Sequence, residues 1–143
     1  MKTIRGRNAV LTGASGGLGR QIGAVLARAG VNMALVGRDV GRLESSAGQF
    51  AARGVNIETY VADIADPADR RNLPLRILGS FEEVDLLINA AGIEHYGRFA
   101  DQTPAAIDKT LGINLLAPLR LALEFLPGMI QRKRGHIVNV GSV

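Results

Sequence analysis

The sequence contains neither cysteine nor tryptophan. Without cysteine, a disulfide framework, a catalytic thiolate and a cysteine-ligated zinc site are all excluded. Only four phenylalanines and two tyrosines are present, so no run of aromatic side chains is available on which nucleic-acid bases stack. The 17 lysines and arginines exceed the 13 acidic residues and give a net charge of +4, but they are scattered along the chain. We therefore expect no nucleic-acid partner, and we assign no metal ligands.

Long apolar runs are also missing. No stretch approaches the roughly 20 apolar residues that a membrane-spanning helix needs, and Met1 to Arg7 carries basic residues with no apolar signal core behind them. We therefore expect a cytoplasmic protein without a membrane partner. Hydrophobic residues make up 47% of the chain and charged residues 21%, as in globular proteins. The 143 residues suffice for one compact unit, so we expect residues 1–143 to form a single domain.

Short apolar runs alternate with longer segments of helical periodicity. We predict strands over residues 8–12, 31–36, 57–62, 84–89 and 137–140. We predict helices from Leu18 to a stop at Gly30, around Leu43 to Phe50, over 65–78, and over 104–131 with Thr103 as the cap and Pro104 first. Strands separated by such helices pair in parallel through right-handed crossovers, with helices on both faces. The sequence therefore predicts an α/β fold with a doubly wound parallel sheet.

Two of the predicted helices carry unusual features. Pro74 lies inside the third helix, where its ring displaces a backbone hydrogen bond, and we expect it to kink or split that helix. The basic residues 132–134 follow the long helix, and we interpret them as positive charge at the negative end of its dipole rather than as a binding patch. In the long helix, Asn114 falls on an apolar stripe that we expect to face the core: Ile107, Leu111, Pro118 and Ala122.

A glycine-rich turn joins the first predicted strand to the first helix. From Thr12 to Gly19 it reads Thr-Gly-Ala-Ser-Gly-Gly-Leu-Gly. Such a turn gathers unpaired backbone N–H groups and the positive end of a helix dipole at one point, where a pyrophosphate binds. We expect Gly13 to allow the tight turn, Gly17 to let the phosphates approach, and Gly19 to let the helix pack on the strand. A glycine turn without a ligand is the alternative, but the strand–turn–helix context favours a dinucleotide.

Residues 12–19 resemble the cofactor signature of the short-chain dehydrogenase/reductase family, and further signatures of that family follow in order. Asp63-Ile64, after the third strand, is similar to the pair that meets the adenine ring. Residues 89–92, Asn-Ala-Ala-Gly, resemble the Asn-Asn-Ala-Gly motif, with Ala90 in place of the second asparagine. Asn114 resembles the asparagine of the family's catalytic tetrad, and Gly141-Ser142 resembles the segment that holds its catalytic serine.

The resemblance implies a Rossmann-type sheet with strand order 3-2-1-4-5, truncated after the fifth strand, so that residues 1–143 form an incomplete NAD(P)-binding domain. It implies that Ser142 hydrogen-bonds the substrate oxygen, and that the backbone of Asn114 holds a water molecule of the proton relay. The residues that it implies for cofactor binding are Gly13, Ser15, Gly17, Leu18, Gly19, Arg38, Asp63, Ile64, Asn89, Ala90 and Gly92.

Several of these residues also have simpler structural interpretations. Asn114 is alternatively an asparagine that bends its helix, and Ser142 a loop serine after a strand. Asp63 is alternatively the cap of the helix that starts near Asp66. Asn89 is alternatively a strand-end side chain that bonds local backbone, and in the family it helps to order the central sheet.

The end of the second strand distinguishes the two nicotinamide cofactors. An acidic residue there binds the ribose hydroxyls of NAD, whereas a basic residue pairs with the additional phosphate of NADP. This sequence has Gly37-Arg38 and no acid there, and a guanidinium binds phosphate through two parallel hydrogen bonds. We therefore expect NADP(H) in preference to NAD(H), with a solvated arginine at a helix start as the alternative. Many relatives that prefer NADP also carry a basic residue where this chain has Gly16.

The family's proton donor, a tyrosine four residues before a lysine, is missing. The tyrosines are Tyr60 and Tyr96, and Ile64 and Ala100 stand four residues after them. The serine and asparagine of the implied catalytic pair supply no acid or base at neutral pH. We therefore expect this chain to be the amino-terminal part of a longer enzyme, which binds cofactor without turnover on its own.

For the whole protein we expect an NADP(H)-dependent oxidoreductase that moves hydride between the nicotinamide and a carbonyl or secondary alcohol. The alternative is a naturally truncated, non-catalytic dinucleotide-binding or regulatory module; the tight glycine spacing disfavours an epimerase of nucleotide sugars. The loop 93–98 lies where substrate would enter, and we assign its His95 no role. The resemblance implies a sixth and a seventh strand with their helices, which would cover the fifth strand and are missing here. We therefore expect an exposed apolar sheet edge and long helix, and a homo-oligomer, a dimer or tetramer, through residues 104–131.

Overall fold

The computed structural model describes residues 3–51 and 54–141, and Ser142 lies outside them. The strands are β1 (Asn8–Thr12), β2 (Asn32–Gly37), β3 (Ile57–Val61), β4 (Leu86–Asn89) and β5 (His136–Asn139). The helices are α1 (Gly17–Arg28), α2 (Val40–Ala51), α3 (Pro67–Phe81), α4 (Pro104–Leu111) and α5 (Ala117–Gln131). A π-helical turn, η2 (Gly112–Leu116), joins α4 to α5, and a short 3-10 turn, η1 (Phe99–Asp101), precedes them.

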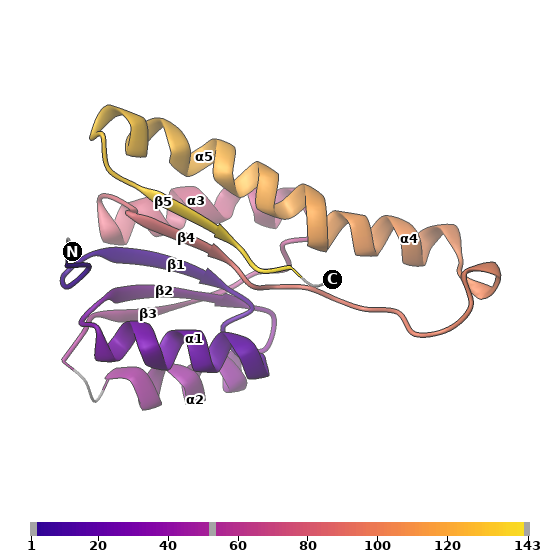
Figure 1. Ribbon diagram of the computed structural model, residues 1–143, viewed down its shortest axis with the longest axis horizontal. Helices are drawn as coiled ribbons and strands as arrows, with labels where there is room; N and C mark the ends of the chain where they lie inside the picture. The colour runs from indigo at the N-terminus through magenta and orange to yellow at the C-terminus, as the bar shows by residue number, and fades with distance from the viewer. Residues whose placement is uncertain (1–2, 52–53, 142–143) are drawn as a thin grey trace.

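The strands form one parallel sheet in the order β3-β2-β1-β4-β5. Helices α1 and α2 cover one face, α3 and α5 cover the other, and α4 extends past the carboxyl ends of the strands (Figure 1). The prediction of a doubly wound Rossmann-type sheet with this strand order is therefore confirmed. The order reverses between β1 and β4, and in open sheets of this kind ligands bind at the carboxyl ends of the strands beside that reversal.

Alternate residues of β1 face opposite sides of the sheet and join two apolar clusters. Leu11 packs with Leu35 and Phe50 in the cluster beneath α1 and α2. Val10 packs with Leu73 and other residues in the cluster beneath α3 and α5. Burial on both faces explains why the sequences of β1 and β2 are almost continuously apolar. These two central strands hold the glycine-rich turn at a fixed place.

The long helical segment is continuous over residues 104–131, as predicted, and Thr103 caps it by accepting the N–H of Ala106 at 3.2 Å. The face predicted to be buried is wrong at Leu111, which is 47% exposed, whereas Ile107, Pro118 and Ala122 are half-buried. Leucines occur on nearly all sides of this helix, so their spacing alone does not identify the buried face. The side chains that face the core are Ile113, Ala117, Leu121, Phe125 and Met129.

The opposite face of this segment is exposed and apolar. Its exposed large side chains are Leu111, Leu115, Leu116, Leu119, Leu123, Leu126 and Ile130. The edge strand β5 and the residue after it are also open, since Val138 is 42% and Val140 38% exposed. By length and composition alone, Pro104–Gln131 is also apolar enough to cross a membrane, which the search for continuous apolar runs did not reveal.

Pro74 does not split its helix, contrary to the expectation. Helix α3 runs without a break from Pro67 to Phe81, with Pro74 in its interior. Pro74 is buried beside Leu73 and Ile77 on the face that packs against the sheet. This packing offsets the loss of one backbone hydrogen bond, as tertiary contacts often do.

The basic residues after α5 form ion pairs rather than acting on the helix dipole alone. Arg134 donates from Nε to Asp85 at 2.6 Å and also pairs with Glu83. Arg132 pairs with Glu83 at 3.1 Å and donates to the carbonyl of Val84 at 2.9 Å. These contacts fix the end of α5 to the amino end of β4, on the side of the sheet away from the glycine-rich turn.

Candidate functional site

A cavity of about 300 Å³ opens at the carboxyl ends of the central strands. The glycine-rich turn, the segment after β3 and the segment after β4 converge on it. Several residues proposed from the sequence to bind cofactor line this cavity: Gly13, Ser15, Arg38, Asp63, Ile64, Ala90 and Gly92. Four others, Gly17, Leu18, Gly19 and Asn89, lie outside its lining.

The glycines of the turn are required by close backbone packing. Gly13 has a φ of +69°, and a Cβ there would lie 2.8 Å from the backbone of Ala90 and Ala91. A Cβ on Gly19 would lie 2.0 Å from the carbonyl oxygen of Gly13. The first turn of α1 therefore packs on the glycine turn itself, rather than on the strand as the sequence suggested. Gly17 differs, since a Cβ there would meet nothing within 4 Å.

The start of α1 has free hydrogen-bond donors. The residue before it is Gly16, which has no capping side chain, and its first turn holds no acidic residue. Backbone N–H groups in the first turn of a helix have no intrahelical partner, and the helix dipole adds positive potential there. This helix start is therefore suited to an anion such as a pyrophosphate.

Thr12 ties the glycine-rich turn to the segment after β4. Its buried hydroxyl oxygen accepts the N–H groups of Ala90 and Ala91, both at 3.2 Å, and donates to the carbonyl of Ile88 at 3.5 Å. Two walls of the cavity are thus joined by one side chain. The sequence reasoning gave Thr12 no role of its own, although a hydroxyl at the end of a central strand indicates a polar contact there.

The segment after β3 is held by its own polar contacts. The carboxylate of Asp63 accepts the N–H of Ala65 at 3.0 Å, and Arg70 donates to the carbonyl of Ile64 at 2.8 Å. The cap of α3 is Asp66, whose carboxylate accepts the N–H groups of Ala68 and Asp69. The alternative that Asp63 caps this helix is therefore wrong. Asp63 and Ile64 line the cavity.

Asn114 lies in the π-helical turn and bonds the loop after β4. Its Oδ1 accepts the N–H of Ile93 at 2.9 Å, and its Nδ2 donates to the carbonyl of Ile93 at 2.8 Å. Asn114 was expected on a face directed at the core, but it is exposed, and both of its hydrogen bonds are to the backbone of Ile93. Ile93 itself lines the cavity, as does Ile113.

Asn89 is buried at the end of β4 and donates to Oδ1 of Asn139 at 2.9 Å. The contact joins β4 to the edge strand β5. Its place supports the interpretation of Asn89 as a residue that orders the sheet. Asn89 directly precedes Ala90, which lines the cavity.

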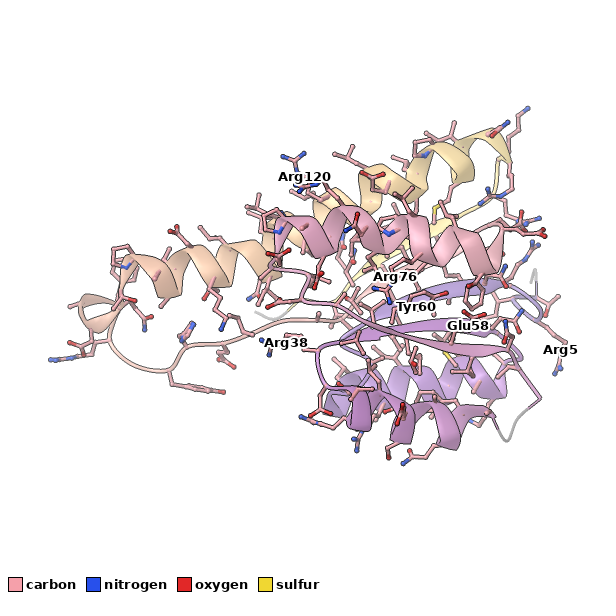
Figure 2. The ribbon with its side chains drawn as sticks, turned by 180° about the vertical axis from the view of Figure 1, so that it is seen from behind. Arg5, Arg38, Glu58, Tyr60, Arg76 and Arg120 are labelled. Carbon is pink, nitrogen blue, oxygen red and sulfur yellow. The ribbon has the colours of Figure 1, made fainter. Side chains whose placement is uncertain are left out.

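Two arginines stand at the side of the cavity next to β2. Arg38 follows β2 and is exposed at the carboxyl end of the sheet (Figure 2). Arg42, in the first turn of α2, also lines the cavity and donates to the carbonyl of Ser15 at 3.1 Å. The sequence reasoning missed Arg42. Its spacing of four residues from Arg38, about one helical turn, was the available signal.

Two tyrosines outside the cavity have a pKa above the ordinary value. Burial raises the pKa of Tyr60, and Glu58, which accepts its hydroxyl hydrogen at 2.9 Å, raises it further. The bond to Glu94 raises the pKa of the exposed Tyr96. Among residues 3–51 and 54–141, no three His, Cys, Asp or Glu side chains are grouped to hold a metal ion.

Comparison with known proteins gives a consistent result. The family model for short chain dehydrogenases matches residues 7–143. Dehydrogenase/reductase SDR family member 7B of Mus musculus is 37% identical over 144 residues, covering 98% of this chain and 45% of that protein. Nodulation protein G of Rhizobium meliloti (strain 1021) is 36% identical over 143 residues, covering 100% of this chain and 57% of that protein. The chain spans about half the length of the curated relatives it matches.

Solved structures agree over almost the whole chain. A metagenomic short-chain oxidoreductase in complex with NADP superposes with a TM-score of 0.94 and 33% identity, covering 99% of this chain and 65% of that one. A short-chain dehydrogenase from Sphingobium yanoikuyae in complex with NADPH superposes with a TM-score of 0.89 and 35% identity, covering 96% of this chain and 54% of that one. The bulky-bulky ketone specific alcohol dehydrogenase from Comamonas testosteroni superposes with a TM-score of 0.89 and 34% identity, covering 96% of this chain and 55% of that one.

Proposed function

Because the chain belongs to the short-chain dehydrogenase family, we propose that it is the NADP(H)-binding part of an oxidoreductase that acts on a carbonyl or secondary alcohol. When bound, the nicotinamide donates or accepts the hydride. The observation that carries the proposal is the convergence of the glycine-rich turn, Asp63-Ile64 and residues 90–92 on one cavity. The ketone-specific relative of similar structure supports the substrate class.

The residues present fit a dinucleotide. Gly17 stands in open space at the start of α1, where a side chain would separate the phosphates from the N–H groups of the first turn. Gly13, Ser15, Gly17, Leu18 and Gly19 form the cradle for the pyrophosphate in this proposal. Asp63 and Ile64 bind the adenine end, and Asn89 keeps Ala90 and Gly92 in place for the remainder of the cofactor.

Arg38 supports NADP(H) rather than NAD(H). It is exposed beside the end of β2, where the additional phosphate of NADP lies in sheets of this class. Complexes of similar structures with NADP or NADPH agree with this choice. In the alternative, Arg38 is a solvated arginine that contacts neither cofactor, and it does not make NADPH bind more tightly than NADH.

For the reaction itself we assign two residues of this chain. Ser142 hydrogen-bonds the substrate oxygen, and the backbone of Asn114 holds a water molecule of the proton relay. A tyrosine four residues before a lysine is absent from the sequence, so these 143 residues do not supply the proton donor of that type. In this proposal residues 1–143 bind cofactor and do not catalyse turnover on their own.

The exposed apolar face of residues 104–131 supports self-association in a cytoplasmic protein. Leu115, Leu119 and Leu123 are each about half exposed or more, and apolar patches of this kind mark protein interfaces. A homo-oligomer formed through this segment buries them. The charged Arg120 and Glu124 on the same helix favour a protein partner over lipid.

Cofactor binding and turnover are tested separately. Titration calorimetry of this chain with NADPH and with NADH measures binding, and we expect tighter binding of NADPH. Turnover is measured as NADPH oxidation with a panel of ketones, using the whole protein that contains residues 1–143. Binding without turnover by the whole protein would favour the alternative, a non-catalytic dinucleotide-binding module. Absence of binding to either cofactor would contradict both.

A further inference from the structure

We propose that the groove between α3 and α5 binds a small anion of about two negative charges, inorganic phosphate or a phosphate monoester. A hollow of about 330 Å³ lies in this groove, and its lining consists of Pro67, Arg70, Arg71, Arg120 and Glu124. None of these residues belongs to the lining of the main cavity. The inference therefore goes beyond the proposed function and does not depend on it.

The arginines of this hollow come from two helices. Arg70 and Arg71 belong to the first two turns of α3, and Arg120 belongs to α5, which shares one apolar cluster with α3. Arg120 lies beside the first half of α3 (Figure 2). An anion in the groove is therefore within reach of guanidiniums from both sides. The planar fork of a guanidinium matches two oxygens of a phosphate, which makes such hydrogen bonds strong.

The guanidinium of Arg70 is already held at the edge of the hollow. Its Nη1 donates to the carbonyl of Ile64 at 2.8 Å and to the carbonyl of Ala65 at 3.3 Å. A guanidinium has five N–H donors, so other donors of Arg70 remain for a ligand. Because these contacts restrict the side chain before a ligand arrives, less conformational entropy is lost on binding.

The positive charge of the hollow is only partly balanced. In the part of the chain that the structure describes, the ion pairs include none of its three arginines. The nearby acids of α3 are bonded to backbone: the carboxylate of Asp66 accepts N–H groups of the first turn, and that of Asp69 accepts the N–H of Asp63 at 2.8 Å. Glu124 is the one acid in the lining. A doubly charged anion would balance the remaining two arginines.

The hollow is separate from the apolar face proposed for self-association. Leu119 and Leu123 lie on that face and are exposed. Arg120 and Glu124 follow them by one residue each, which turns their side chains by about 100° around the helix. No leucine of that face lines the hollow. An oligomer formed through the leucines and an anion in the groove therefore use different sides of α5.

The test follows the backbone amides of the isotope-labelled chain by NMR while inorganic phosphate replaces chloride at constant ionic strength. We expect the signals of residues 68–71 and 119–124 to shift together and to saturate with one dissociation constant. Phosphate bound at the glycine-rich turn would instead shift the signals of residues 13–19. The anion site and the proposed cofactor site are thus observed separately in one titration.

Three variants identify the side chains responsible. Arg120→Ala removes one guanidinium, and we expect the dissociation constant to rise by about tenfold, the lower value for a charge-assisted hydrogen bond because the site is open to solvent. Glu124→Gln removes the opposing charge and should lower the constant by about two- to fivefold. Lys109→Ala is the matched control: Lys109 is an exposed cation of the same long helical segment and lies outside the hollow, so its constant should change by less than about twofold.

The same spectra show whether each variant is folded, because the signals of the central strands keep their positions in a folded protein. Signals of residues 68–71 that stay in place, or that move in proportion to phosphate without saturating, would overturn the inference, since the arginines would then be solvated side chains without a bound ion. Equal losses in Arg120→Ala and Lys109→Ala would overturn it as well, because only the overall charge would matter. A saturating response confined to residues 13–19 would support the proposed cofactor site and overturn this one.

Discussion

The side-chain amide of Asn114 pairs with the backbone of Ile93 through two hydrogen bonds of 2.9 and 2.8 Å. The geometry resembles the two-bond exchange between opposite residues of antiparallel strands, although one partner is a side chain. Asn114 lies within the π-helical turn Gly112–Leu116, and such wide turns are frequent at functional sites. Ile93 borders both the main cavity and a hollow formed by the loop after β4 and α4. The pair therefore fixes the wall between them.

The first prediction concerns this pair. Asn114→Ala removes both hydrogen bonds, each worth about 0.5–1.5 kcal/mol net, so we expect the free energy of unfolding to fall by about 1–3 kcal/mol. The affinity for NADPH should fall too, because Ile93 is no longer held against the cavity. Urea unfolding and NADPH titration measure the two effects. Asn72→Ala is the matched control, since Asn72 is an exposed residue of α3; a loss of similar size in that variant would contradict the role of the pair.

The part of the fold nearest the site is the part that the sequence predicts best. The bounds of β1, residues 8–12, agree with the prediction, and β2 differs by one residue at each end. Both strands are buried on both faces and end in glycine or polar residues, so composition alone marks their limits. The convergence of Gly13, Asp63 and Gly92 follows from topology, because all parallel strands end on the same side of the sheet.

Features that depend on packing between distant segments are harder to predict from the sequence. The buried face of the long helix is decided by the sheet beneath it, and leucines on its other side obscure the period. Pro74 is tolerated because it packs in the core, which no local rule indicates. Arg42 becomes visible as a site residue only once α2 lies beside the turn at Ser15.

The second prediction separates packing from ligand approach at two glycines of α1. Gly19→Ala places a Cβ 2.0 Å from the carbonyl oxygen of Gly13, which is backbone and moves little. We expect a loss of about 3 kcal/mol or more in the free energy of unfolding, at the upper end of overpacking effects. Gly17→Ala meets nothing within 4 Å, so stability should stay equal or rise by up to about 1 kcal/mol, while NADPH affinity falls.

Thermal unfolding and calorimetric titration of the two variants test this prediction together. The expected pattern is a destabilised Gly19→Ala and a stable Gly17→Ala with weakened NADPH binding. A Gly17→Ala variant with unaltered NADPH affinity would show that the phosphates do not approach the start of α1. A Gly19→Ala variant of normal stability would contradict the packing described for the turn.

The third prediction concerns the pH dependence of Tyr60. Burial raises the pKa of Tyr60 above its ordinary value of about 10, and the bond to Glu58 adds to the rise. Tyr60 lies near Glu58 and Arg76, as seen from behind the molecule (Figure 2). Because the folded pKa is above the unfolded one, the contribution of Tyr60 to stability is complete below about pH 10 and is lost as the pH rises through the folded pKa.

Absorbance at 295 nm measures this titration, because the only two tyrosines are Tyr60 and Tyr96. Tyr60→Phe identifies which step belongs to which residue. Glu58→Gln should lower the midpoint of Tyr60 without returning it to about 10, since burial is the larger cause. A midpoint that reaches the unfolded value in Glu58→Gln would mean that burial contributes nothing.

The fourth prediction concerns the ion pairs at the opposite end of the sheet. Asp85 is buried at the start of β4, accepts the N–H of Asn8 at 3.2 Å and bonds Arg134 at 2.6 Å. In Asp85→Ala the amide of Asn8 loses its acceptor in a part-buried place, which alone costs about 1–3 kcal/mol in the free energy of unfolding. Glu83→Gln should cost less, because the Glu83 side chain is 36% exposed and surface ion pairs contribute little.

Both variants are measured by urea unfolding at low and at high salt. Salt screens exposed ion pairs more strongly than buried ones. The loss in the free energy of unfolding caused by Glu83→Gln should therefore shrink at high salt, while the loss caused by Asp85→Ala persists. The cavity lies at the other end of the strands, so NADPH affinity of the folded Asp85→Ala protein should be unchanged. A parallel loss of NADPH affinity would mean that this cluster acts on the cavity through β4, rather than only fixing α5 and β5 to the sheet.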